Sequence, residues 1–286
     1  MRDTKSQKDP IRTDIQPTSR RVGIFVDALS VTLNGGFGLR YDILRRFGCR
    51  DGAFPSRLNV YLAYDETRAK EDPNYEAKTE RFCEVLRDFE YKVFEKPVEN
   101  LQETEQEEEG DKSVVDVDIS VDIIAQAHEL DRIVLLANEA SYSKVVKAAQ
   151  HRGCRVELIG FDNVNPKLKR EVDMFMSGYV IPGLLPVKSP YEWGTVGSRV
   201  RGVCYDFSHN EGYGFLRYLS RVNDRLWVTD SRSSDSPYNT VFAHVSQFEQ
   251  DFDTAFLPSR DLIFEFNLVE NEKGLVAEDI MLVSAP

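Results

Sequence analysis

The sequence predicts two domains, an α/β domain with a parallel sheet followed by a small all-β barrel. Strand patterns alternate with helical patterns over residues 21–180, which is typical of a parallel sheet that helices cover on both faces. Over residues 199–286, short strands alternate with turns and no helical pattern persists, which favours a barrel. Residues 181–198 are rich in proline and glycine and are predicted to be a linker. Residues 1–20 are polar and are predicted to be a flexible tail.

Hydrophobic periodicity defines the elements of the α/β domain. The first strand is a nearly continuous apolar run that ends at Asp27, as expected for a buried parallel strand. Phe82, Leu86 and Phe89 recur at helical spacing. The elements are predicted in the order strand 21–26, strand 58–63, helix 74–90, strand 91–94, helix 115–130, strand 132–137, helix 141–152, strand 154–160 and helix 165–176.

The strand patterns of the second domain are short and are separated by turn residues. About 90 residues of this pattern indicate a small barrel. The strands are predicted at residues 201–207, 213–219, 226–229, 241–244, 262–268 and 276–283.

The composition excludes several classes of protein. The chain has 286 residues, of which 41% are hydrophobic and 29% are charged, so it is neither collagen-like nor wholly disordered. No apolar run approaches the roughly 20 residues that a membrane-spanning helix needs. The N-terminus lacks the apolar segment of a secretory signal, and the four cysteines form no CxxC pair that would suggest structural zinc. These features predict a cytoplasmic protein with free thiols.

The net charge of −12 is unusual for a nucleic-acid binder, because phosphate affinity comes largely from Lys and Arg. Part of the excess lies in the acidic run of residues 103–111, which is predicted to be a solvated loop. A chain with this charge would have to bind nucleic acid through stacking rings and a bound cation rather than through a broad basic surface.

Acidic residues gather where the predicted sheet would hold a functional site. Asp27 ends the first strand and Glu139 follows the strand at 132–137, and functional groups of parallel sheets collect at the carboxyl ends of the strands. Asp116, Asp118 and Asp122 lie on the helix that precedes that strand. Clustered carboxylates suit Mg²⁺ or Mn²⁺ and metal-assisted phosphodiester hydrolysis. The alternative is that Asp116 caps the helix and that the other acids are solvated.

Three strings, RVGIFVDALSVTLN, VDVDISVDII and RIVLLANEASYSKVVKAAQHRGCRVELIGF, resemble the NYN family of PIN-like ribonucleases. The resemblance extends over about residues 21–180. It implies a metal-dependent endoribonuclease that uses Mg²⁺ or Mn²⁺. It also implies metal-binding acids at Asp27, Asp116 and Glu139, with Asp122 as a further catalytic candidate.

The chain departs from the family pattern at three places. Ser30 stands near the position where the family usually has Asn, and Ser141 stands where the family has a second carboxylate. Glu139 is one methylene longer than the usual Asp, which matters because metal geometry must hold within a fraction of an ångström. A domain that binds RNA without cutting it is therefore the alternative.

Aromatic residues of the second domain have the spacing of a stacking surface. Tyr213 and Phe215 are two residues apart on one predicted strand, so they face the same side, and Phe242 and His244 do the same on another. Bases of single-stranded nucleic acid stack on such rings with about 1 to 3 kcal/mol each. The alternative is that these rings belong to the barrel core.

The strings GYGFL and VFAHVS, within a frame of residues 199–284, resemble the two ribonucleoprotein motifs of cold-shock domains. The resemblance implies a five-stranded OB-type barrel that binds single-stranded RNA or DNA. The base-stacking residues that it implies are Phe207, Tyr213, Phe215, Phe242 and His244. The family's aromatic or basic positions are occupied by Asp206, Glu211 and Val245 here, and the segment 217–240 is longer than usual, which should weaken binding.

Together the two resemblances predict an RNA-binding protein, a metal-dependent endoribonuclease whose barrel presents single-stranded RNA. The alternative is a catalytically impaired domain that acts only by binding RNA. A third hypothesis is a regulatory module whose acidic surface recruits a protein partner.

Overall fold

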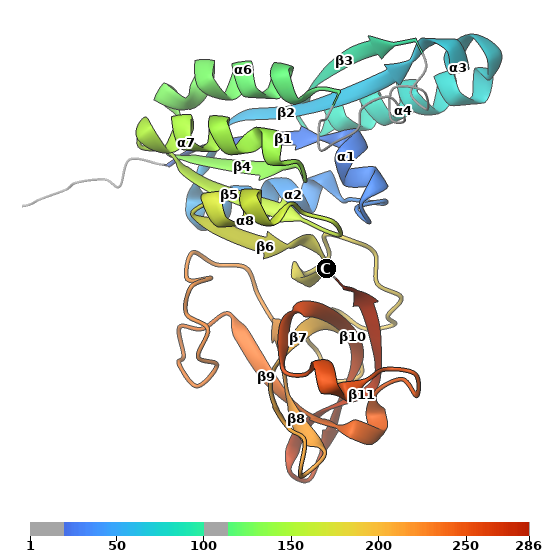
Figure 1. Cartoon of the computed structure of the whole chain (residues 1–286), viewed down its shortest axis with the longest axis vertical. Helices are drawn as coiled ribbons and strands as arrows, with labels where there is room; N and C mark the ends of the chain where they lie inside the picture. The colour runs from blue at the N-terminus through green and yellow to red at the C-terminus, as the bar shows by residue number, and fades with distance from the viewer. Residues whose placement is uncertain (1–19, 100–113, 286) are drawn as a thin grey trace, which may run out of the picture.

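The computed structural model describes residues 20–99 and 114–285. Within this part the chain forms a six-stranded parallel sheet with helices, and a closed barrel of five strands below it in Figure 1. The predicted fold class is therefore confirmed. The predicted acidic loop at residues 103–111 and residues 1–19 of the predicted tail lie outside the described residues. No helix of the described ranges is both long and apolar enough to span a membrane.

The sheet has the strand order β3-β2-β1-β4-β5-β6, and every neighbouring pair is parallel. Its strands are β1 (Arg21–Asp27), β2 (Phe54–Asp65), β3 (Lys92–Val98), β4 (Arg132–Leu136), β5 (Arg155–Gly160) and β6 (Met174–Ser177). The chain leaves β1 toward β2 on one side, and β4 lies on the other side. The order therefore reverses between β1 and β4, and this is where open α/β sheets bind ligands beyond the carboxyl ends of their strands.

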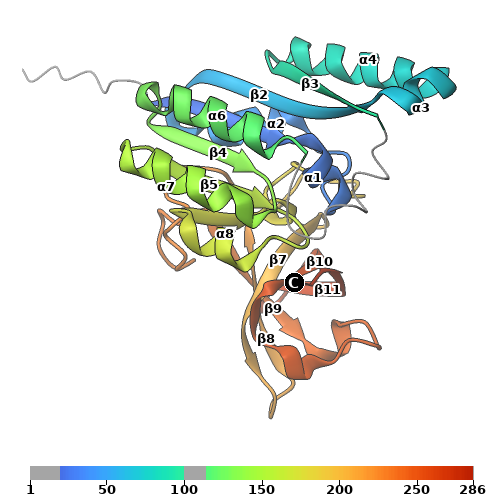
Figure 2. The same cartoon turned by 45° about the horizontal axis from the view of Figure 1, so that its top comes forward.

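Helices cover both faces of the sheet (Figure 2). They are α1 (Ala28–Leu33), α2 (Tyr41–Gly48), α3 (Glu66–Glu71), α4 (Pro73–Asp88), α6 (Asp116–Gln126), α7 (Ser143–His151) and α8 (Pro166–Glu171). Residues of α1 and α2 pack with Ile24 and Val26 of β1 in one apolar core. Residues of α6 and α7 pack with Phe25 in the core on the opposite face. The alternation along β1 thus places a layer of helices on each side.

The helix predicted at residues 165–176 is wrong in its second half. Helix α8 ends at Glu171, and the chain then extends to form β6, the edge strand beside β5. The Asp173 carboxylate accepts a hydrogen bond from the Val156 backbone N–H at 2.7 Å, which holds the chain against β5 just before β6 begins. Sequence periodicity could not separate such a short apolar strand from the end of a helix.

The strand predicted at residues 226–229 is also wrong, because Leu226 and Trp227 lie in a turn and residues 228–229 are irregular. Leu226 is buried in a core that it shares with the α/β domain, whereas the neighbouring Trp227 is 78% exposed. An alternation of buried and exposed side chains therefore arises here from a loop that packs onto another domain.

The barrel closes through β10, which pairs with both β7 and β11. Its strands are β7 (Arg199–Ser208), β8 (Tyr213–Leu219), β9 (Tyr238–His244), β10 (Ser259–Asn271) and β11 (Gly274–Ser284). Phe264, Phe266 and Leu216 fill the interior without exposed surface. Five strands closed in this way are consistent with an OB-type barrel.

The two domains pack against each other. Leu219, Leu226 and Ile263 of the barrel domain belong to the same apolar core as the α/β residues Met176 and Tyr179. At the end of β11, near the C-terminus in Figure 1, the Ser284 hydroxyl donates a hydrogen bond to Asp162. The predicted linker contributes to the same core, because Ile181, Leu184 and Leu185 are buried in it. The shared core holds the barrel in one orientation relative to the sheet.

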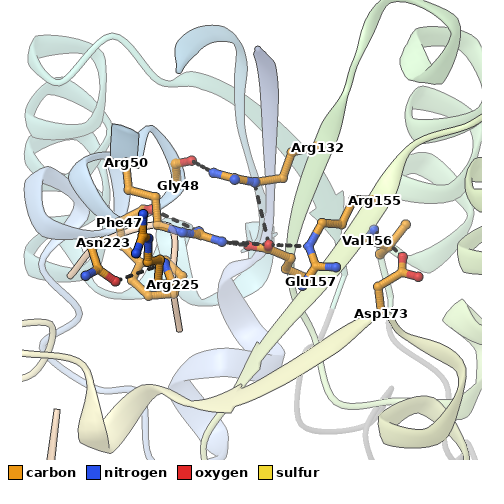
Figure 3. A network of polar contacts seen from close by, with 10 residues as sticks. All are labelled: Phe47, Gly48, Arg50, Arg132, Arg155, Val156, Glu157, Asp173, Asn223 and Arg225. Carbon is orange, nitrogen blue, oxygen red and sulfur yellow. Dashed lines mark hydrogen bonds and ion pairs between the residues drawn. The ribbon is translucent and has the colours of Figure 1, made fainter. Parts of the chain in front are cut away.

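A buried ion-pair network stabilises the amino edge of the sheet, opposite the edge of Asp27 (Figure 3). The Glu157 carboxylate has no exposed surface and lies 2.6 Å from Arg50 Nη2, 2.9 Å from Arg155 Nε and 3.5 Å from Arg132 Nε. Burial raises the pKa of Glu157, but the hydrogen bond and charge of Arg50 and the neighbouring guanidiniums outweigh it and leave the pKa below its usual value. The network therefore has a structural role.

We expect Glu157→Ala to lower the free energy of unfolding by about 3 to 5 kcal/mol, because it leaves buried guanidinium groups without their carboxylate. Urea denaturation followed by circular dichroism measures this loss. The matched control is Glu95→Ala, whose exposed pair with Arg87 at 3.3 Å should contribute no more than about 1 kcal/mol. Equal losses in the two variants would contradict a structural role for the network.

Candidate functional site

Asp27 ends β1 at the carboxyl edge of the sheet, next to the point where the strand order reverses. Its side chain is fully buried. Oδ1 accepts a hydrogen bond from the Ser30 backbone N–H at 3.0 Å, so Asp27 caps α1. Oδ2 accepts a hydrogen bond from the Tyr142 hydroxyl at 2.9 Å. These contacts fix the orientation of the carboxylate.

Glu139 follows β4, the strand beside β1, and its carboxylate lies close enough to Asp27 for the two charges to interact. Burial raises the pKa of Glu139, and the negative charge of Asp27 raises it further. The neighbouring Ser30 hydroxyl and the backbone N–H of Asn138, which lies 3.2 Å from Oε2, lower the pKa of Glu139 but do not cancel the rise. The structure therefore brings two predicted site residues together, and their repulsion favours a proton or a cation between them.

Further oxygen atoms lie on the segments that carry the pair. Asn138 Oδ1 and Ser141 Oγ are buried and have no hydrogen-bond partner within the described residues, and the buried Ser30 Oγ lies beside the Glu139 carboxylate. Hydroxyl, amide and carboxylate oxygens are the ligands that Mg²⁺ and Mn²⁺ prefer, and Mg²⁺ is often held by one or two carboxylates and several waters. The residues present at this edge therefore fit a hydrated divalent cation.

The other predicted acids lie on α6. The Asp122 carboxylate accepts a hydrogen bond from the Tyr61 hydroxyl at 2.6 Å, and Asp118 pairs with Lys96 at 2.8 Å. Asp116 is the first residue of α6 and is half-buried. No group of three or more Asp, Glu, His or Cys side chains in the described ranges is placed to hold a metal ion. A three-carboxylate metal site with Asp116, and a catalytic role of Asp122, stay predictions.

We expect Glu139→Gln to raise the midpoint of thermal unfolding by a few degrees at pH 7 without divalent cations. The pKa of this carboxyl is higher in the folded protein than its usual value of 4.5, so the folded state binds the proton more tightly than the unfolded state does. The destabilisation by the ionised Glu139 is absent well below pH 4.5, grows as the pH rises through the folded-state pKa, and is complete above it.

Thermal unfolding of the wild-type chain and the Glu139→Gln variant at pH 4 and pH 7 measures this effect. The difference between them should be present at pH 7 and small at pH 4, and Mn²⁺ should stabilise the wild-type chain more than the variant. A difference of equal size at both pH values would contradict charge repulsion as its cause.

Aromatic rings gather on the outer face of the barrel. Tyr213 and Phe215 of β8 lie beside Phe242 of β9, with ring centroids 5.4 Å apart for Tyr213 and Phe242 and 6.1 Å apart for Phe215 and Phe242. The exposed His244 lies opposite Tyr213 in the strand register. These four residues, all at least partly exposed, are called the ring surface below. Such a surface suits unpaired bases.

Phe207 lies outside the ring surface. It is 8% exposed and belongs to the barrel core, where its ring contacts Phe248 edge-on with centroids 6.2 Å apart. The motif placed Phe207 on β7 correctly, but a bulge in the pairing of β7 with β8, between Cys204 and Asp206, shifts the alternation of side chains just before it. An aromatic residue predicted to stack on bases therefore packs inside the barrel.

The sequence analysis did not predict three neighbours of the ring surface, which are Arg217, Tyr205 and Tyr238. The Arg217 guanidinium lies 5.3 Å from the ring centroid of Tyr205 and 5.3 Å from that of Tyr238. The sequence did contain a signal for Arg217, because it continues the two-residue spacing of Tyr213 and Phe215 along β8.

In the α/β domain, no sequence signal could have shown that Tyr142 donates a hydrogen bond to Asp27, because the two residues lie on separate elements.

The comparison with protein families concerns the α/β domain. The sequence model of the NYN domain matches residues 21–182. A search of curated proteins gave no match. A crystal structure of a protein of unknown function from Vibrio parahaemolyticus is similar, with 21% sequence identity and a TM-score of 0.44, over 56% of this chain and 93% of that chain.

Proposed function

Because this chain belongs to the NYN domain family, which includes ribonucleases, we propose that it is a metal-dependent endoribonuclease. Its substrate is single-stranded RNA, which the barrel binds and presents to the α/β domain.

The Asp27–Glu139 pair is the observation that carries this proposal. It lies at the reversal point of the sheet, and the pKa of Glu139 is raised by burial and by the charge of Asp27. A Mg²⁺ or Mn²⁺ ion held there would neutralise the negative charge of the phosphodiester and would make a bound water more acidic. The residues of the chain hold the geometry: Tyr142 and the Ser30 backbone fix the Asp27 carboxylate.

The barrel supports single-stranded RNA as the substrate class. Rings that are partly exposed on one outer face accept unpaired bases, whereas the bases of a double helix are already stacked on each other. Stacking also tolerates any base sequence, which fits a chain whose net charge of −12 gives it no broad basic surface.

The test is incubation of the full chain with end-labelled single-stranded RNA in Mn²⁺ or Mg²⁺, with a chelator in a parallel reaction. Internal cleavage that requires the cation and is blocked by the chelator supports the proposal. Bound RNA that stays intact at every cation concentration would refute the nuclease activity and leave only binding.

A second candidate function is RNA binding without cleavage. It is favoured by the hydrogen bonds that already engage both Asp27 oxygens, and by Ser141 in place of an acidic residue. This candidate predicts the same RNA affinity for wild-type protein and Asp27→Asn, with no cation-dependent product from either.

A further inference from the structure

Two hollows lie side by side where β6 of the α/β domain meets the barrel. One encloses about 350 Å³ and the other about 280 Å³, and both are lined by Phe175, Ser177 and Arg260. The first also reaches Lys169, and the second reaches Arg217 and Tyr238. The two hollows share lining residues, and together they are called the interdomain groove below, which is defined by Lys169, Phe175, Ser177, Arg217, Tyr238 and Arg260.

The groove continues the ring surface of the barrel. Arg217 lies two residues after Phe215 on β8, so the two side chains share the outer face. Phe242 lies opposite Phe215, and Tyr238 lies four residues before Phe242 on β9, again on the same face. A strand of RNA that leaves the ring surface along β8 and β9 therefore meets Arg217 and Tyr238 next.

The opposite end of the groove reaches the carboxyl edge of the sheet. Asn165, which lines the first hollow, donates its backbone N–H to the carbonyl oxygen of Asn138 at 2.8 Å. Asn138 directly precedes Glu139, and its side-chain oxygen is buried without a hydrogen bond within the described part of the chain. The groove thus ends at Asn165, whose backbone contacts the residue that precedes Glu139.

The charge of the groove is the reverse of the charge of the chain. Lys169, Arg217 and Arg260 converge on it, and none of them forms an ion pair with a carboxylate among residues 20–99 and 114–285. Burial lowers the pKa of Arg217, and the positive charge of Arg260 lowers it further, so these two cations are close. Asp261 is the one acid among the described residues that line the two hollows. Unpaired cations in a chain of net charge −12 favour an anionic ligand.

Rings accompany these cations. Lys169 Nζ lies 4.8 Å from the ring centroid of Phe175, and the Arg217 guanidinium lies over Tyr238. The Ser177 hydroxyl is buried in the groove wall without a hydrogen-bond partner within the described ranges. A channel for a single strand combines cations that contact phosphates with rings that stack on bases. The Ser177 hydroxyl could bind a sugar or phosphate oxygen.

We propose that the interdomain groove guides the backbone of a single RNA strand from the ring surface to the Asp27–Glu139 pair. This inference rests on the proposed function and adds the path of the substrate. The apolar core shared by Leu219, Leu226 and Ile263 with the α/β domain keeps the groove open in one geometry. The barrel and the nuclease site then act on the same RNA molecule.

The test measures the affinities of the wild-type chain and of a variant with a charge-reversed groove for RNAs of two lengths. An RNA of about 6 nucleotides covers the ring surface, whereas one of about 20 nucleotides also spans the groove. In the double variant Lys169→Glu with Arg260→Glu, affinity for the longer RNA should fall at least about tenfold, and affinity for the shorter RNA should change less than about twofold. The salt slope for the longer RNA should decrease by about 1.4, because two phosphate contacts are lost.

The matched control is Lys78→Glu with Arg81→Glu on α4, which changes the net charge equally at exposed positions of another surface. It should leave both affinities within about twofold of wild type. If circular dichroism shows that the charge-reversed groove variant is not folded, Lys169→Gln with Arg260→Gln replaces it. A smaller loss of affinity is then expected, and only for the longer RNA.

Equal losses for both RNA lengths, or for the groove and control variants, would overturn the groove path while leaving RNA binding intact. Unchanged RNA affinity together with weaker binding of a peptide of about 20 glutamates would overturn it in favour of an acidic protein partner. Absence of RNA binding by the wild-type chain would refute the proposed function itself.

Discussion

Replacing Phe215 and Phe242 together by alanine should reduce affinity for single-stranded RNA about 30-fold or more. Each ring that stacks on a base contributes about 1 to 3 kcal/mol, so two rings supply at least about 2 kcal/mol. The two side chains lie opposite each other in the register of β8 and β9 and are partly exposed, so their removal should leave the barrel folded. Fluorescence anisotropy with a labelled RNA of about 20 nucleotides measures the affinity.

The matched control removes two other exposed rings. Phe54 is 58% exposed at the start of β2, and Phe256 is 67% exposed on a loop of the barrel. Phe54→Ala with Phe256→Ala should leave the affinity unchanged. Unchanged affinity in the Phe215 and Phe242 variant, or an equal loss in the control, would show that the ring surface does not bind RNA.

Asp27→Asn should reduce the rate of RNA cleavage about 1,000-fold. The substitution removes one of the two charges at the carboxyl edge, and charge stabilisation by a metal contributes several kcal/mol to such a reaction. The asparagine oxygen can still accept the Ser30 backbone N–H, so the cap of α1 is retained. Single-turnover cleavage at saturating protein measures the rate without interference from RNA affinity.

The control for this variant is Asp118→Asn. Asp118 carries the same charge, but it lies on α6 in an exposed pair with Lys96. Its removal should change the cleavage rate no more than about threefold, since exposed ion pairs contribute up to about 1 kcal/mol. Equal cleavage by wild-type and Asp27→Asn protein would place the reaction elsewhere in the chain.

The sequence predicted the sheet well because its central strands are buried on both faces. The apolar run that ends at Asp27 is typical of a buried parallel strand, and it forms β1 in the structure. The edge strand β6 was predicted as helix, because four residues are too few for a period to be measured. The positions of Asp27 and Glu139 after predicted strands also predicted that they lie at the same edge of the sheet.

Features that depend on contacts distant in sequence could not be predicted. Tyr142 reaches Asp27 across 115 positions of the chain, and no local pattern marks that hydrogen bond. Phe207 has the spacing of a stacking ring, yet it is buried beyond a bulge in the pairing of β7 with β8. The interdomain groove exists only because the barrel packs on β6, so its cations Lys169 and Arg260 are ordinary surface residues in the sequence.

The charge of the chain is consistent with this arrangement. A net charge of −12 argues against a broad basic surface, and the structure instead places Lys169, Arg217 and Arg260, which form no ion pair within the described residues, along one groove. Salt should therefore weaken RNA binding less steeply than in proteins with six to ten phosphate contacts, because few phosphates are neutralised.

The most direct measurement is single-turnover cleavage of an internally labelled single-stranded RNA by the full chain, with Mn²⁺ added after binding is complete. We expect internal cleavage that starts on addition of Mn²⁺, that spares the same RNA when it is base-paired, and that is lost in Asp27→Asn while binding persists. RNA that stays bound and uncut by the wild-type chain at every Mn²⁺ or Mg²⁺ concentration would contradict a nuclease site at the Asp27–Glu139 pair.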